Sequence, residues 1–214
     1  MTLRRFARLS VVSTLLMLVA RDARAQDPRL RGALDVETLA RVTRFTDSAR
    51  AESLPTDPLV GVALEGAQRR APGARIARAV QEYLGALRGA RVALGVEASA
   101  PEIVSGAGVL LAGVPADVLK RMRAGNPHRS LTVPLVVLAD LVARGVPKDT
   151  ASRAIETVAR GNAKDDDFTA LRRLVEQDIG AGASPATATM LRARSLNGVV
   201  PPDPVAPAPA VRRP

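Results

Sequence analysis

Few residues in this sequence have the types and spacing that catalysis requires. His128 is the only histidine, and Ser130 and Asp140 follow it closely, so these three are the one candidate set for a nucleophile and its general base. No nucleophile elbow or other local signature accompanies them. Cysteine is absent, so the sequence also lacks the ligands of an ordinary zinc site. We therefore expect a non-enzymatic protein without a cofactor. A hydrolase built on His128, Ser130 and Asp140 is the alternative.

Two other segments have a superficial likeness to binding loops. The acidic run Asp165 to Asp167 follows Lys164 and lacks the central glycine of a calcium loop, so we predict that it caps a helix. Gly106 and Gly108 lie inside a helical pattern rather than after a strand. Their spacing therefore indicates close helix packing, not a dinucleotide loop.

Arginines are the remaining candidates for binding. The chain has a formal net charge of +10, but its aromatic content is 2%, which is too low for the stacking platform of a nucleic-acid-binding protein. We expect no nucleic acid partner and instead contact with an anionic surface. The alternative is a solvated basic surface with no specific partner. The candidate contact residues are Arg69, Arg70, Arg121, Arg123 and Arg129.

The N-terminal segment predicts export. Arg4, Arg5 and Arg8 precede an apolar run over residues 9–20, and Ala23 and Ala25 supply the small side chains of a cleavage site. The apolar run is shorter than the roughly 20 residues that span a bilayer as a helix. We predict a signal peptide over residues 1–25, cleaved after Ala25, and a periplasmic or secreted protein with no transmembrane segment after cleavage. An uncleaved anchor is the alternative.

Helical periodicity dominates the rest of the chain and predicts an all-α fold. Residues 76, 79, 80, 83, 84 and 87, for example, are apolar and share one helix face. The segment 131–143 is apolar nearly all round and is predicted to be the most buried helix. Its Asp140 then needs a partner, either His128 or an arginine. We predict helices over residues 36–50, 57–70, 73–94, 101–112, 115–124, 133–144, 147–160, 166–180 and 185–196.

A repeated motif predicts how these helices are joined. The segment Gly113 to Asp117 (GVPAD) recurs at 145–149 (GVPKD), with looser copies at 53–57 and 182–185. Glycine in the left-handed conformation ends a helix, and proline is favoured at the first position of the next. We therefore expect tight Gly-x-Pro corners. The irregular proline spacing favours a compact array over a solenoid of fixed period, with helical-repeat ancestry as the alternative.

Together these observations predict the organisation of the chain. After the signal peptide we expect a linker over 26–34, one domain of about eight or nine short helices over 35–197, and a disordered Pro-rich tail over 198–214. The predicted function is an exported, non-enzymatic interaction or structural module of the cell envelope. Its partner would be an envelope protein or an anionic envelope surface. The alternatives are the envelope hydrolase above and a periplasmic chaperone or carrier with an apolar groove.

Overall fold

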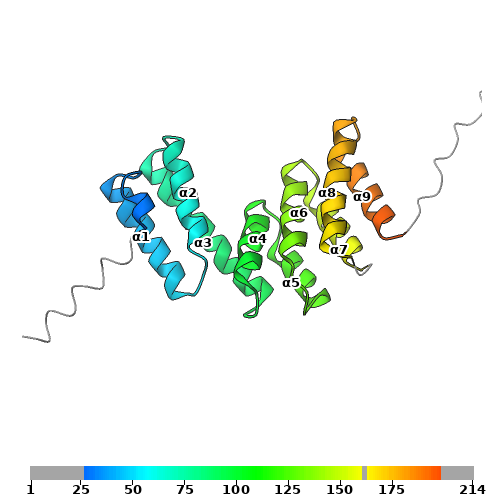
Figure 1. Cartoon of the computed structure of the whole chain (residues 1–214), viewed down its shortest axis with the longest axis horizontal. Helices are drawn as coiled ribbons and strands as arrows, with labels where there is room; N and C mark the ends of the chain where they lie inside the picture. The colour runs from blue at the N-terminus through cyan, green and yellow to red at the C-terminus, as the bar shows by residue number, and fades with distance from the viewer. Residues whose placement is uncertain (1–26, 161–162, 199–214) are drawn as a thin grey trace, which may run out of the picture. The chain divides into compact units, whose positions relative to one another are not determined.

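The computed structural model describes residues 27–160 and 163–198 (Figure 1). These residues form α-helices and no strand, which confirms the predicted all-α class. Both ends of each predicted helix lie within two residues of the ends of the corresponding observed helix. The predicted signal peptide and the tail from residue 199 onward lie outside the described residues. After a short 3-10 helix, η2 (Pro28–Leu30), the elements are α1 (Val36–Ala51), α2 (Asp57–Gln68), α3 (Gly73–Leu94), α4 (Ala100–Leu111), α5 (Ala116–Gly125), α6 (Thr132–Ala143), α7 (Lys148–Arg160), α8 (Asp165–Gly180) and α9 (Pro185–Leu196).

The chain divides into two compact units, residues 1–84 and 85–214. The described part of unit 1 contains η2, α1, α2 and the first half of α3. Its segment 26–34, predicted as a linker, includes η2, which contacts α2, and Leu30 is only 1% exposed. Residues 28–30 of this segment therefore pack against α2.

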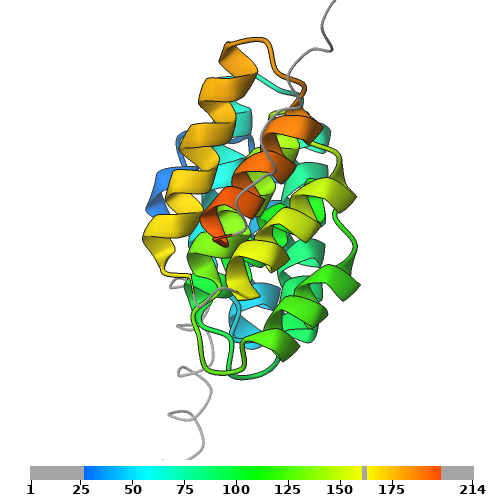
Figure 2. The same cartoon turned by 90° about the vertical axis from the view of Figure 1, so that its right-hand side faces the viewer.

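Unit 2 contains the second half of α3 and helices α4 to α9. In this unit α6 contacts both α4 and α8, while α7 contacts α9. Figure 2 shows α8, in yellow-orange, lying beside α9, in orange-red. Contacts between helices two apart in sequence also occur in stacked helical hairpins, the arrangement of the helical-repeat alternative.

Helix α6 is the centre of unit 2, as its apolar sequence predicted. It contacts α4, α7 and α8, and the side chains of Leu135, Leu138 and Leu141 are fully buried. None of the described helices is long and apolar enough to cross a membrane.

The predicted corners are present, with one correction. Gly113 has φ +79°, its N–H donates to the Leu110 carbonyl at 2.9 Å, and the Val114 N–H donates to the Val109 carbonyl at 3.2 Å. These two bonds form a Schellman motif. The corner at Gly145 repeats them, with φ +87°. Val114 and Val146, the residues after the two glycines, are both buried.

The prolines of the two GVP corners lie one position earlier than predicted. Pro115 has ψ 146° and is the N-cap of α5, not its first helical residue. Its carbonyl accepts the Val118 N–H at 3.1 Å, and the carbonyl of Pro147 accepts the Ala151 N–H at 2.9 Å. An N-cap has extended ψ, which the fixed φ of proline permits, so proline turns the chain into the new helix.

Close helix packing at Gly106 is confirmed. A Cβ there would lie 3.0 Å from a methyl of Leu94, 3.1 Å from Ala90 Cβ and 3.2 Å from a methyl of Leu119. The absence of a side chain therefore lets α4 approach the end of α3 and the start of α5. A Cβ at Gly108 would face open space, so close helix packing explains the glycine at position 106 but not the one at position 108.

Candidate functional site

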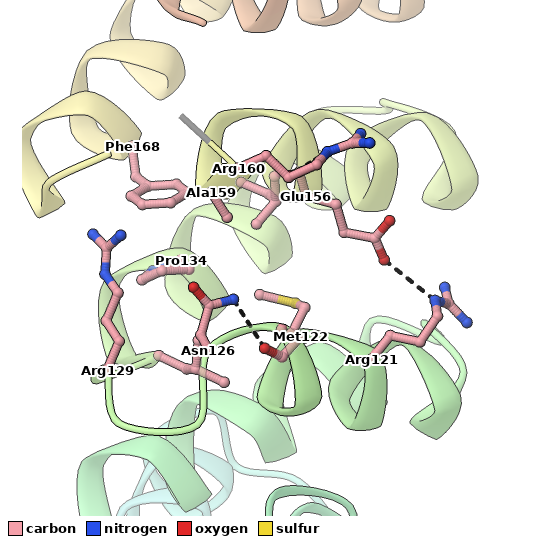
Figure 3. Close-up of a pocket in the computed structure, with 12 residues that line it drawn as sticks. Arg121, Met122, Asn126, Arg129, Pro134, Glu156, Ala159, Arg160 and Phe168 are labelled. Carbon is pink, nitrogen blue, oxygen red and sulfur yellow. Dashed lines mark hydrogen bonds and ion pairs between the residues drawn. The ribbon is translucent and has the colours of Figure 1, made fainter. Parts of the chain in front are cut away.

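Helices α5, α6 and α7 and the start of α8 surround a pocket of about 270 Å³ within unit 2 (Figure 3). Met122 of α5 faces Ala159 of α7 across it, and Pro134 of α6 and Phe168 of α8 lie at one end. Met122, Ile155 and Phe168 are core residues that also line this space. The apolar lining residues are Met122, Leu131, Pro134, Ile155, Ala159 and Phe168.

Arg129 lies at the edge of this pocket. Its guanidinium is over the Phe168 ring, 5.3 Å from the ring centre, within the range of a cation–π interaction. It is also 3.6 Å from a carboxylate oxygen of Asp165, which is a long ion pair. The side chain is 27% exposed. Arg129 is therefore positioned by the aromatic ring and only partly neutralised by its carboxylate partner.

Arg121 and Glu156 form the other end of the pocket. The Arg121 Nε donates to Glu156 Oε1 at 3.3 Å, which joins α5 to α7, and Arg121 also pairs with Asp117 on its own helix. The hydrogen bond with Asp117, followed by that with Glu156, raises the pKa of Arg121 above its ordinary value despite some desolvation. Arg121 is therefore a paired cation.

Arg160 and Asn126 complete the polar lining. Arg160 donates to the backbone carbonyl of Glu156 at 3.3 Å and to the hydroxyl of Thr157 at 3.2 Å, and among the described residues no carboxylate forms an ion pair with it. Asn126 Nδ2 donates to the Met122 carbonyl at 3.0 Å. This bond turns the Asn126 side-chain oxygen toward Pro134, where it can accept a hydrogen bond (Figure 3).

Arg123 has a different environment from Arg121 and Arg129. Its guanidinium pairs with Glu102, which is 5% exposed, and also donates to the backbone carbonyl of Arg129 at 3.1 Å. Burial alone would raise the pKa of Glu102, but hydrogen bonds from the backbone N–H groups of Leu131 and Ser99 and from Arg123 lower it below its ordinary value. Arg123 therefore serves an internal network.

The remaining candidates, Arg69 and Arg70, lie in unit 1 and are exposed. Arg69 pairs with Glu65 at 2.6 Å, one helical turn away. Arg70 has φ +53° and occupies the left-handed position of a helix end. The structure thus brings two of the five predicted arginines, Arg121 and Arg129, to one pocket.

The three residues of the alternative hydrolase site, His128, Ser130 and Asp140, are not hydrogen-bonded to one another. Asp140 pairs with Arg172 at 3.2 Å, which confirms an arginine as the partner it needed. The Ser130 hydroxyl donates to Thr132 at 3.2 Å, and His128 is exposed. Thr132 begins α6, and Asp140 lies about 12 Å farther along that helix at ~1.5 Å per residue.

The acidic run at the start of α8 acts as predicted. Asp167 Oδ2 accepts the Lys164 N–H at 2.7 Å, which satisfies a backbone donor at the start of the helix, and Asp165 faces Arg129. No group of three metal-ligating side chains occurs in the described residues.

Sequence reasoning missed Asn126, Arg160 and Phe168 as pocket residues. Phe168 follows the helical pattern of a core residue, and Arg160 follows that of an exposed helix end, so neither position signals a site. Comparisons with known protein families, with curated proteins and with solved structures found no match to this chain.

Proposed function

We propose that the protein is an exported, non-enzymatic helical binding module of the cell envelope. It holds an anionic partner mainly at Arg129, whose ion pair with Asp165 is long, with the paired Arg121 at the other end of the pocket, while an apolar group of that partner enters the pocket between α5, α6 and α7. The observation that carries this proposal is the pocket itself, which combines an apolar lining with arginines at its edge. Ligand sites are typically apolar cavities with a few convergent polar groups.

The architecture supports a binding role. Stacked helical hairpins contact mainly their neighbours and present extended surfaces that partners use. The second candidate function, a periplasmic carrier with an apolar groove, is favoured by the same apolar lining. It differs in that the occupant would be a small molecule rather than a partner protein. A hydrolase has weaker support, because His128, Ser130 and Asp140 do not converge.

Export is tested by expressing the chain with its natural N-terminus in a Gram-negative host. We expect to recover a periplasmic or secreted protein whose measured mass matches a chain that starts at Gln26. A product that keeps residues 1–25 would contradict the predicted cleavage after Ala25.

Binding is tested by immobilising the recovered protein and applying solubilised envelope fractions at low and high salt. We expect an envelope component to be retained at low salt and lost at high salt, because screening weakens exposed charge pairs. The double variant Arg121→Gln/Arg129→Gln should retain much less. Arg153→Gln is the matched control, since Arg153 is exposed on α7 and does not line the pocket. Equal retention by all the variants, or none by the wild type, would refute the proposal.

A further inference from the structure

We infer that the pocket binds a medium-chain carboxylate, an apolar chain of about eight carbons that ends in a single negative charge. This inference rests on the proposed binding function and specifies the chemistry of its occupant. It follows from three properties of the pocket: its volume, the character of its lining and the balance of charge at its edge.

The volume limits the size of the occupant. At ~30 Å³ for each non-hydrogen atom, the share of a water molecule in the liquid, about 270 Å³ holds about nine such atoms. Pockets for drug-sized ligands usually measure 300–1,000 Å³. Octanoate, with about ten non-hydrogen atoms, fits the available space with its carboxylate at the mouth.

The lining favours an aliphatic chain. Ile155 and Phe168 line the pocket and are 0% exposed, so their packing holds them as a fixed apolar wall. Met122, opposite Ala159, has a flexible thioether that adapts to an irregular occupant. Burying each CH₂ group of a chain here removes apolar surface from water, which is the main source of affinity.

The long ion pair of Arg129 favours a singly charged group. The three arginines Arg121, Arg129 and Arg160 are opposed by Asp117, Glu156 and Asp165. Among the described carboxylates, none pairs with Arg160, and the Arg129 pair is long at 3.6 Å. A carboxylate can therefore take the place of Asp165 on Arg129 and match the planar guanidinium with both oxygens. A doubly charged phosphate would face the negative charges of Glu156 and Asp165.

The methionines provide a direct readout. The sequence has four, of which Met122 lines the pocket and Met190 lies in α9 outside it. The full chain is labelled with ¹³C at the methionine methyl groups, the Met122 signal is assigned with Met122→Leu, and octanoate is titrated. We expect the Met122 signal to shift in a saturable manner and the Met190 signal to stay in place.

Two variants test the two halves of the ligand separately. Arg129→Gln removes the charge and the paired hydrogen bonds to both carboxylate oxygens, and should weaken octanoate binding about tenfold or more. Ala159→Leu fills the pocket and should abolish the shift while leaving Arg129 in place. Arg153→Gln, on the exposed face of α7, should bind octanoate like the wild type.

Matched probes test the chemistry. Octylamine and 1-octanol have the same chain without the negative charge, butyrate has the charge with a shorter chain, and octyl phosphate carries more charge. All four should bind more weakly than octanoate. Equal binding of 1-octanol, or tighter binding of octyl phosphate, would overturn the assignment. So would an unmoved Met122 signal at about 10 mM octanoate, where even a Kd of about 1 mM gives near saturation.

The two proposals fail in different ways. If octanoate leaves Met122 unmoved while envelope retention still depends on Arg121 and Arg129, the ligand class is wrong and the binding module stands. If octanoate binds but no envelope component is retained, the site belongs to a small-molecule carrier and the partner protein is refuted.

Discussion

At the scale of single residues, Glu102 connects more of unit 2 than any residue that the sequence marked for function. Its carboxylate accepts the Leu131 N–H at 2.8 Å and the Ser99 N–H at 2.9 Å, and it pairs with Arg123. It thereby links the start of α4, the end of α5 and the start of α6. Because Glu102 is buried, removing its charge leaves Arg123 without its ionic partner in the interior.

We predict that Glu102→Gln lowers the free energy of unfolding by about 3 kcal/mol at pH 7, the loss expected when one partner of a buried ion pair is removed. The difference from the wild type should shrink in acid. The folded-state pKa of Glu102 lies below its ordinary value of 4.5, so its stabilising effect is complete above that value and is lost as the pH falls through the folded-state pKa. Urea unfolding at several pH values measures both effects.

Glu97→Gln is the control for this prediction. Glu97 is exposed and lies in the same unit, so the substitution should change stability by no more than about 0.5 kcal/mol. A pH dependence of the Glu102→Gln variant equal to that of the wild type would show that the pKa of Glu102 is not linked to folding.

At the scale of elements, backbone conformation at the corners determines where the helices stop. The Schellman hydrogen bonds seen at Gly113 and Gly145 also form at Ser53, which has φ +55°. There the Leu54 N–H donates to the Ala49 carbonyl at 2.8 Å. The hydrogen bonds therefore define the corner, and glycine makes it less costly, because a side chain in the left-handed region is strained by about 1–2 kcal/mol.

We predict that Gly145→Ala lowers the free energy of unfolding by about 1 kcal/mol or more. A Cβ at Gly145 would meet no atom within 4 Å, so the effect comes from its φ of +87° alone. Gly108→Ala is the matched control, since Gly108 also faces open space but lies inside α4. There alanine should stabilise the helix by up to about 1 kcal/mol. Chemical denaturation measures the change in the free energy of unfolding for both variants. Changes of the same sign would contradict the prediction.

At the scale of the whole molecule, α3 is the element that both units share. Val80 and Leu84 are core residues in its first half, and Leu87, Ala90 and Leu94 are core residues in its second half. A helix gains most of its stability from packing of its apolar face, so loss of either half's packing weakens the same helix. The prediction of one domain over residues 35–197 therefore requires that α3 couple the packing of its two halves.

We predict a single cooperative unfolding transition for the full chain. The calorimetric and van't Hoff enthalpies should agree, and far-UV circular dichroism should give the same midpoint as calorimetry. Two separated transitions would instead mean that residues 27–84 and 85–198 unfold independently, and that the continuity of α3 does not couple them.

The sequence alone determined the helices and their corners, because periodicity, capping residues and turn glycines act over a few neighbouring positions. It also predicted the central helix and the need of Asp140 for a partner, either His128 or an arginine, and the structure shows Arg172. Only the tertiary structure decided the roles of the individual arginines. Arg123 and Arg129 lie only six residues apart, yet one pairs with Glu102 and the other lies over Phe168. Those partners are distant in sequence, so their pairing depends on the tertiary arrangement of α4, α5 and α8.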